Sequence, residues 1–253
     1  MLLFPDRKNA REALTYPVTL GHSIMDTPEK RYQQVRNQLA DACQNAGRDP
    51  ASVCLVAVSK TRPGADLAAL AALGQRDFGE NYLQEALDKM AALEDPGLIW
   101  HFIGPIQSNK TRDLAAHFQW VHSVDRLKIR RRLSDQRPEG LPPLNVCIQV
   151  NIDDEDSKSG VAVSEVAALA EAIAALPRLR LRGLMAIPRA DSADRNRGAF
   201  RQLAMTLSSL RNRMPELDTL SMGMSDDFDV AIEEGATHIR VGTALFGPRP
   251  PKD

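Results

Sequence analysis

The chain has 253 residues, of which 43% are hydrophobic, so it is long enough for one large barrel or for two smaller domains. Lysine and arginine number 32 and aspartate and glutamate 33, and the resulting net charge of -1 excludes the strongly basic surface typical of nucleic-acid-binding and membrane-surface proteins. The longest apolar stretches also fall well short of the roughly 18 residues that span a bilayer. From the charge and the apolar pattern together we expect no nucleic-acid partner and no membrane partner.

Residues 1–26 show no clear hydrophobic period and are predicted to form a disordered N-terminal extension. Charged residues at positions 6–8 interrupt any apolar core, which argues against a secretory signal. Met25 directly precedes a helix start, so translation from Met25 is an alternative hypothesis. We predict one domain over residues 27–253 and a cytoplasmic location.

The three cysteines are few and widely spaced, and we expect them to be free thiols, as in proteins of a reducing compartment. Their spacing does not suit zinc. The acidic run at 153–156 lacks the glycine and the spacing of a calcium loop, so it is predicted to be a solvated loop. No metal site is therefore predicted.

Regular structure is predicted to begin at Thr27-Pro28, which is typical of a helix N-cap followed by proline at the first helical position. The helix is expected to run to about Ala46, where Gly47 ends it. The next segment, 53–58, is apolar and partly β-branched, as in a strand that is buried on both faces.

The same unit then recurs along the chain. Further strands are predicted near 77–79, 100–103, 120–123, 144–150, 181–187, 219–222 and 238–241. Helical spacing of alanine and leucine occurs at 66–73, 84–93, 163–176 and 199–214. Eight strands that alternate with helices favour a (β/α)8 TIM barrel. The alternative, an open doubly wound sheet, usually carries a glycine-rich loop after its first strand, where this chain has Ser59-Lys60-Thr61.

Lys60 follows the first predicted strand, at the end where barrels of this kind build their sites. Strand alternation places Val56, Val58 and Lys60 on one face. If that face is the interior, the amine lies at the barrel mouth, where desolvation favours the neutral form that a Schiff base requires. The alternative is a lysine that extends into solvent.

The last two strands are followed by Gly223-Met224-Ser225 and by Gly242-Thr243. Loops after strands seven and eight are the usual phosphate site of such barrels, and glycine amides with nearby hydroxyl groups suit an anion. Ordinary turn glycines are the alternative. Arg240 shares a strand face with Gly242, and it is predicted to meet either a ring nitrogen of a bound cofactor or a carboxylate inside the barrel, at Glu80 or Asp125.

Seven segments, in order, resemble the YggS/PROSC family of pyridoxal 5'-phosphate (PLP) homeostasis proteins over nearly all of 28–247. They are LVAVSKTRP, FGENYLQE, WHFIGPIQSNK, VHSVD, VNIDDEDSKSG, LRGLMAIP and LSMGMSDDFDVAIEEGATHIRVGTALFG. The resemblance implies a fold-type III PLP barrel, similar to the N-terminal domain of alanine racemase. One departure is Arg62, where family members often have a lysine.

The resemblance also implies roles for individual residues. Lys60 carries PLP as a Schiff base, Asn81 lies near the ring, and Arg240 faces the pyridine nitrogen. The phosphate is bound by Ser225, Gly242 and Thr243, with backbone help from Met222 and Gly223. Lys158 is expected to be a second lysine near the site.

The family points to a PLP carrier or regulator without robust turnover, which hands PLP to PLP-dependent apo-enzymes and has no catalytic residues. Arg240 only donates hydrogen bonds, so it would leave the pyridine nitrogen unprotonated and weaken PLP as an electron sink. Racemases similar to this barrel have an additional β-domain that brings a tyrosine, and we expect neither that domain nor its dimer here, hence a monomer. The alternatives are a PLP-dependent amino-acid racemase and a PLP-free Schiff-base aldolase.

Overall fold

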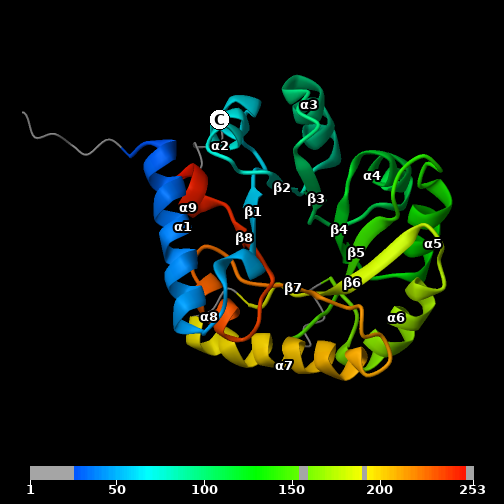
Figure 1. The fold of residues 1–253 in the computed structure, drawn as a ribbon. Helices are drawn as coiled ribbons and strands as arrows, with labels where there is room; N and C mark the ends of the chain where they lie inside the picture. The colour runs from blue at the N-terminus through cyan, green and yellow to red at the C-terminus, as the bar shows by residue number, and fades with distance from the viewer. Residues whose placement is uncertain (1–25, 154–158, 190–192, 249–253) are drawn as a thin grey trace, which may run out of the picture.

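Eight parallel strands form a closed barrel in a computed structural model that describes residues 26–153, 159–189 and 193–248 (Figure 1). Each strand pairs with the next one in the chain, and β8 returns to pair with β1. The arrangement confirms the predicted (β/α)8 barrel and excludes the open doubly wound sheet. Of the predicted extension 1–26, only Asp26 belongs to the described part.

The strands are short and the helices alternate with them. The strands are β1 (Cys54–Val58), β2 (Asp77–Glu80), β3 (Ile99–Phe102), β4 (Trp120–Val124), β5 (Leu144–Gln149), β6 (Leu179–Met185), β7 (Thr219–Ser221) and β8 (His238–Val241). The helices are α1 (Pro28–Asn45), α2 (Gly64–Ala72), α3 (Leu83–Leu93), α4 (Thr111–His117), α5 (Leu127–Gln136), α6 (Val166–Ala174), α7 (Ala193–Arg211), α8 (Phe228–Glu233) and α9 (Thr243–Phe246). Three 3-10 turns are η1 (Pro50–Ser52), η2 (Ser108–Lys110) and η3 (Val163–Glu165).

Helix α1 lies outside the barrel and packs against α8 and α9, as Figure 1 shows beside β1 and β8. It begins as predicted, because the Thr27 hydroxyl accepts a hydrogen bond from the Lys30 amide at 3.3 Å and Pro28 occupies the first turn. Val35 and Leu39 are buried on its inner face. The helix thus covers the seam where the first and last strands pair.

The barrel separates two cores. The larger core lies between the strands and the surrounding helices, while a small apolar cluster of Trp120, Cys147 and Met185 fills part of the interior. Two fully buried imidazoles, His101 and His122, and the half-buried His238 that packs against them add to that filling. The interior is therefore packed, and it is unusually polar for a barrel whose filling is normally aliphatic.

These imidazoles make the stability of the fold depend on pH. Burial lowers the pKa of His101, lowers that of His122 well below the ordinary value, and lowers that of the neighbouring His238 to about 3, so all three are neutral in the folded chain near neutral pH. Unfolding restores an ordinary pKa near 6.5. Below that pH the unfolded chain therefore binds more protons than the folded chain, and the free energy of unfolding decreases as the pH is lowered. Each imidazole contributes about 1.4 kcal/mol per pH unit in that range, and burial of Glu80, which raises its pKa, acts in the opposite direction.

We therefore expect the free energy of unfolding to be about 3–4 kcal/mol lower at pH 5.5 than at pH 7.5, measured by urea titration of cofactor-free protein. His122→Gln should remove about a third of this difference. His117→Gln is the matched control, because His117 is exposed on α4 and should leave the difference unchanged. If His122→Gln kept the whole stability difference between pH 5.5 and pH 7.5, buried neutral His122 would not be a source of that difference.

Candidate functional site

A cavity of about 220 Å3 opens at the carboxyl ends of the strands. Its walls come from β1 and β8 and from the loops that follow β1, β2, β3, β6, β7 and β8. The lining residues are Val58, Lys60, Arg62, Asn81, Ile103, Ile187, Met224, Ser225, Asp226, Arg240, Gly242 and Thr243. Six of the eight predicted cofactor-binding residues thus lie around one cavity, at the end of the barrel where sites of this fold form.

Lys60 reaches this cavity from the loop after β1, together with Val58 two residues earlier. The alternation of side chains predicted for β1 therefore continues beyond its last residue, so that Val58 and Lys60 face the same cavity. The next residue, Thr61, has a φ of 63°, which is strained for a β-branched residue. The Thr61 amide donates to Glu85 Oε1 at 2.5 Å, so the side chain at the start of α3 holds the strained turn that presents Lys60.

Behind the same turn lies a buried ion cluster. Lys89 Nζ on α3 donates to Glu80 Oε1 and to the Ser59 carbonyl, both at 2.7 Å, and to Glu85 Oε1 at 2.5 Å. The Ser59 hydroxyl also donates to Glu80 Oε1 at 2.6 Å. Burial raises the pKa of Glu80, and the hydrogen bonds from Lys89 and Ser59 act against that rise. Glu80 therefore supports the lysine loop instead of pairing with Arg240.

Asn81 offers an unmatched acceptor to the cavity. Its Oδ1 is buried, and no hydrogen-bond partner for it exists within the described part of the chain. A Cβ at Gly104 would collide with the Asn81 backbone, so this close approach requires glycine. A buried amide oxygen without a donor is costly, so a bound ligand with a hydroxyl or N–H group would relieve it.

The loops after β7 and β8 meet at one wall of the cavity. Ser225 follows β7, and its Oγ accepts a hydrogen bond from the Ala244 amide at 3.5 Å. Gly242 and Thr243 lead into α9, where the first amides lack intrahelical partners. Ser225, Gly242 and Thr243 therefore line one wall of the cavity, at the position predicted for a phosphate.

Two predicted phosphate residues do not line this cavity. The Met222 amide donates to the His238 carbonyl at 3.1 Å, and the Gly223 carbonyl accepts from the Arg240 amide at 3.0 Å. Gly223 has a φ of 91°, and a Cβ there would lie 2.6 Å from that of Ala231. Both residues shape the turn after β7, and Met224 lines the cavity in their place.

Arg240 forms the floor of the cavity and is 4% exposed. Its Nη1 donates to Ser221 Oγ at 2.8 Å and its Nη2 to the Ala186 carbonyl at 2.9 Å. The predicted alternative of an ion pair with Glu80 or Asp125 is wrong, because Glu80 bonds to Lys89 and Asp125 bonds to Arg126. Burial lowers the pKa of Arg240 to about 10, so the guanidinium remains charged near neutral pH.

Several lining residues were not predicted from the sequence. Ile103 and Ile187 add apolar walls, and Asp226 adds a carboxylate. Arg62 also lines the cavity, and its Nη2 donates to the carbonyls of Gly247 and Pro248. The predicted second lysine, Lys158, lies outside the described residues.

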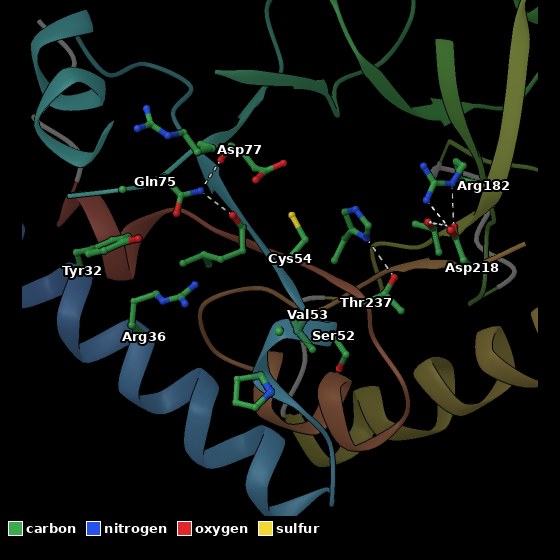
Figure 2. A pocket seen from close by; sticks show the side chains of 17 residues that line it. Tyr32, Arg36, Ser52, Val53, Cys54, Gln75, Asp77, Arg182, Asp218 and Thr237 are labelled. Atoms are coloured by element: carbon green, nitrogen blue, oxygen red, sulfur yellow. Dashed lines mark hydrogen bonds and ion pairs between the residues drawn. The ribbon is translucent and has the colours of Figure 1, made fainter. Parts of the chain in front are cut away.

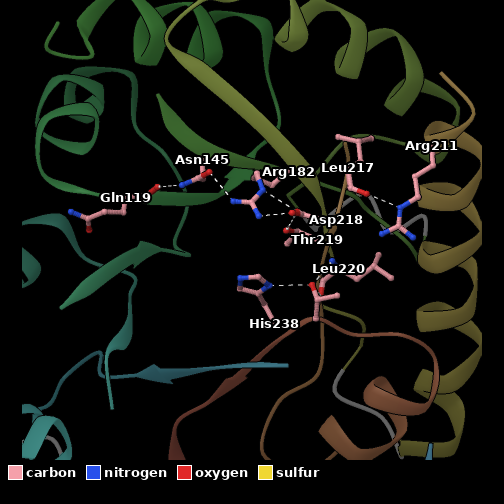
Figure 3. A network of polar contacts seen from close by, with 10 residues as sticks. Gln119, Asn145, Arg182, Arg211, Leu217, Asp218, Thr219, Leu220 and His238 are labelled. Carbon is pink, nitrogen blue, oxygen red and sulfur yellow. Dashed lines mark hydrogen bonds and ion pairs between the residues drawn. The ribbon is translucent and has the colours of Figure 1, made fainter. Parts of the chain in front are cut away.

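The opposite, amino-end mouth of the barrel holds a larger cavity of about 560 Å3 (Figure 2). One of its charged groups is fully engaged: Arg182 pairs with Asp218 at 2.5 Å and donates to Asn145 Oδ1, beside the cavity, at 3.0 Å (Figure 3). The Arg182 guanidinium also stacks over the Trp120 ring, 4.8 Å from its centroid. Residues at this end of such a barrel usually serve stability, and we assign the candidate site to the carboxyl end.

The described residues show no helix long and apolar enough to cross a membrane. Within the described ranges there is also no group of three or more histidine, cysteine, aspartate or glutamate side chains arranged to hold a metal ion. The three cysteines are free, with Cys43 and Cys147 buried and Cys54 half-buried.

The barrel and the cavity at its carboxyl end define a class of protein, the barrels of the alanine racemase N-terminal domain, and the model of that family matches residues 31–250. The chain is 61% identical over 227 residues to the pyridoxal phosphate homeostasis protein of Pseudomonas aeruginosa, covering 89% of this chain and 97% of that protein. It is 53% identical over 220 residues to the protein of the same name from Escherichia coli K12, covering 85% and 94%. The chain belongs to the family of the pyridoxal phosphate homeostasis proteins, which confirms the resemblance found in its motifs.

Solved structures agree with this assignment. PipY from Synechococcus elongatus, solved with PLP bound, is 38% identical with a TM-score of 0.76, and the match covers 87% of this chain and all of PipY. Alanine racemase from Corynebacterium glutamicum is 19% identical with a TM-score of 0.63, covering 87% of this chain and 62% of the racemase. The second likeness shows the shared barrel fold alone.

Proposed function

We propose that the chain binds PLP in the carboxyl-end cavity, holds it as a Schiff base on Lys60, and serves intracellular PLP homeostasis without robust turnover. The observation that carries the proposal is the single cavity shared by Lys60, the buried Asn81 Oδ1 and the Arg240 guanidinium. PLP is bound in the related PipY, and close relatives are named for PLP homeostasis. PLP-dependent apo-enzymes are the proposed recipients.

The residues around the cavity fit the groups that PLP presents. Lys60 supplies an amine that condenses with the aldehyde, forming a C=N bond and releasing water. Asn81 Oδ1 lacks a donor, and a hydroxyl group of the bound cofactor would suit it. Ser225, Gly242 and Thr243 supply hydroxyl and amide donors for the phosphate, and we retain Met222 and Gly223 as backbone contributors through the turn that they shape.

Arg240 is expected to lower the catalytic power of bound PLP without abolishing it. PLP, when bound, acts as an electron sink for amino-acid chemistry, and a protonated pyridine nitrogen strengthens the sink. A charged guanidinium can only donate a hydrogen bond, so Arg240 holds that nitrogen in its unprotonated form.

Racemisation also needs an acid/base group on each face of the ring. Of the tyrosines in the described ranges, Tyr82 is 57% exposed at the start of α3, and Tyr32 lies at the amino-end cavity. Neither lines the Lys60 cavity, so neither takes the acid/base role of a racemase tyrosine in that cavity.

The test is turnover by protein loaded with PLP. We expect incubation with L-alanine or L-serine to yield no more D-isomer than free PLP does under the same conditions, measured by chiral chromatography. D-isomer formation that requires Lys60 would replace the carrier with the racemase alternative.

The phosphate assignment gives a second measurement. Thr243→Val should raise the Kd for PLP about 10- to 100-fold, because it removes a hydroxyl that donates to a charged group. Binding of pyridoxal, which lacks the phosphate, should change less than about twofold. Thr243→Ser is the matched control and should bind PLP normally. Equal weakening of PLP and pyridoxal would remove Thr243 from the phosphate site.

A further inference from the structure

A continuous line of hydrogen bonds crosses the barrel interior beneath Arg240. Arg240 Nη1 donates to Ser221 Oγ at 2.8 Å, and Ser221 Oγ lies 2.8 Å from His122 Nδ1. His122 Nε2 lies 3.0 Å from His101 Nδ1, and His101 Nε2 lies 2.9 Å from Asp77 Oδ1. We call Ser221, His122, His101 and Asp77 the interior chain. It joins the floor of the cofactor cavity to the opposite mouth, where Asp77 lines the larger cavity (Figure 2).

The chemistry of the two ends fixes the direction of every bond in this chain. The Asp77 carboxylate only accepts, so His101 carries its hydrogen on Nε2 and accepts on Nδ1. His122 then donates from Nε2 and accepts on Nδ1 from the Ser221 hydroxyl. Ser221 Oγ is left with the lone pair that Arg240 uses. Each group therefore donates toward Asp77, in one uninterrupted sequence from a buried cation to a carboxylate.

The direction of these hydrogen bonds matters because the Arg240 guanidinium is buried. Both of the hydrogen bonds described for its guanidinium go to neutral oxygens, those of Ser221 and Ala186. The buried Asp227 adds a nearby negative charge, but its own carboxylate accepts from Asn196 and from the Met224 amide. Consecutive hydrogen bonds polarise one another, so the Asp77 carboxylate at the far end strengthens the hydrogen bond between Ser221 Oγ and the Arg240 guanidinium.

We propose that the interior chain positions Arg240 against the pyridine nitrogen of PLP, with Asp77 setting the hydrogen-bond direction from the far mouth of the barrel. The inference rests on the proposed function, because it concerns the group that Arg240 faces. It makes Asp77, His101, His122 and Ser221 positioning residues, which act through Arg240 and touch no cofactor atom.

Asp77→Asn tests this without altering the cofactor cavity. An amide both accepts and donates, so the variant keeps the shape of the chain but no longer fixes its direction. Asp218→Asn is the matched control, because Asp218 is a second carboxylate of the same mouth and bonds to Arg182 outside the interior chain (Figure 3). Affinity is measured for PLP and for 1-deaza-PLP, in which a C–H group replaces the ring nitrogen.

We expect the wild-type protein and Asp218→Asn to prefer PLP over 1-deaza-PLP. Asp77→Asn should lose about three- to tenfold in affinity for PLP and change less than about twofold toward 1-deaza-PLP. If Asp77→Asn weakens the binding of both ligands equally, Asp77 has a purely structural role and the inference is wrong. An unchanged preference for PLP in Asp77→Asn, or an equal loss of that preference in Asp218→Asn, would also overturn it. Wild-type protein that binds both ligands equally would contradict the contact between Arg240 and the ring nitrogen, and the inference with it.

A second readout needs no cofactor. Long-range 15N–1H NMR of ligand-free protein should show His101 and His122 each protonated on Nε2, and Asp77→Asn should populate the Nδ1–H forms. Wild-type imidazoles protonated on Nδ1 would overturn the interior chain itself. Because this measurement is made without PLP, it separates a failure of the chain from a failure of the proposed cofactor binding.

Discussion

Lys60→Ala is expected to abolish covalent attachment of PLP while leaving weaker, reversible binding. The wild-type protein incubated with PLP should show the visible absorption of a Schiff base, lose it on borohydride reduction, and gain the mass of one cofactor per chain. The variant should show neither the visible absorption nor the added mass, because no other described lysine lines the cavity. The phosphate contacts proposed for Ser225, Gly242 and Thr243 would not depend on the amine, and charge-assisted hydrogen bonds contribute about 1.5–3 kcal/mol each.

The residual binding distinguishes two parts of the site. Lys60→Ala should bind PLP saturably, and inorganic phosphate should compete. Lys60→Arg is the matched control, because arginine keeps the charge but cannot form a Schiff base, so it should match Lys60→Ala in the reduction experiment. Wild-type levels of covalent attachment in either variant would refute the assignment of Lys60. Peptide mapping after reduction also tests the predicted second lysine, Lys158.

The order of elements was predictable because buried parallel strands are short, apolar and partly β-branched. The segments at 144–150 and 238–241 match β5 and β8 within one residue. Helix α5 was not predicted: half of its sequence LKIRRRLSDQ is charged, and Ile129 and Leu133 are the only apolar residues among those it buries. Helix α4 is seven residues long, which leaves too few turns for a clear period.

The site was predictable where a rule of the fold assigns a position to a residue. Strand ends identified Lys60 and Asn81, and the loops after the last two strands identified Ser225 and Thr243. The partners of Arg240 could not be predicted in this way. Its hydroxyl partner lies on β7 and the imidazoles below it lie on β3 and β4, so the contact depends on how the closed barrel staggers its strands. Sequence alternation names a face but does not fix that stagger.

Lys89 illustrates the same limit and leads to the largest stability effect that we expect. It lies in the middle of α3, 29 residues after Lys60, where a lysine is ordinarily predicted to be exposed. Instead it is 5% exposed and donates to Glu80 Oε1, to Glu85 Oε1 and to the Ser59 carbonyl. Lys89→Met should lower the free energy of unfolding by about 3–5 kcal/mol at neutral pH, because it leaves the Glu80 carboxylate buried without its cation. Urea titration of cofactor-free protein measures this loss.

The cause of the loss can be separated from simple misfolding. Protonation of Glu80 relieves its unpaired charge, so the loss in Lys89→Met should shrink at acidic pH, and Lys89→Met combined with Glu80→Gln should recover part of it at neutral pH. Glu85→Gln is a milder control, because Glu85 is 28% exposed and its charge is partly solvated. Since Lys89 and Glu85 also fix the turn that carries Lys60, Lys89→Met should form the Schiff base more slowly even under conditions where it remains folded. A normal rate of Schiff-base formation would mean that the turn holds Lys60 in place without the ion cluster.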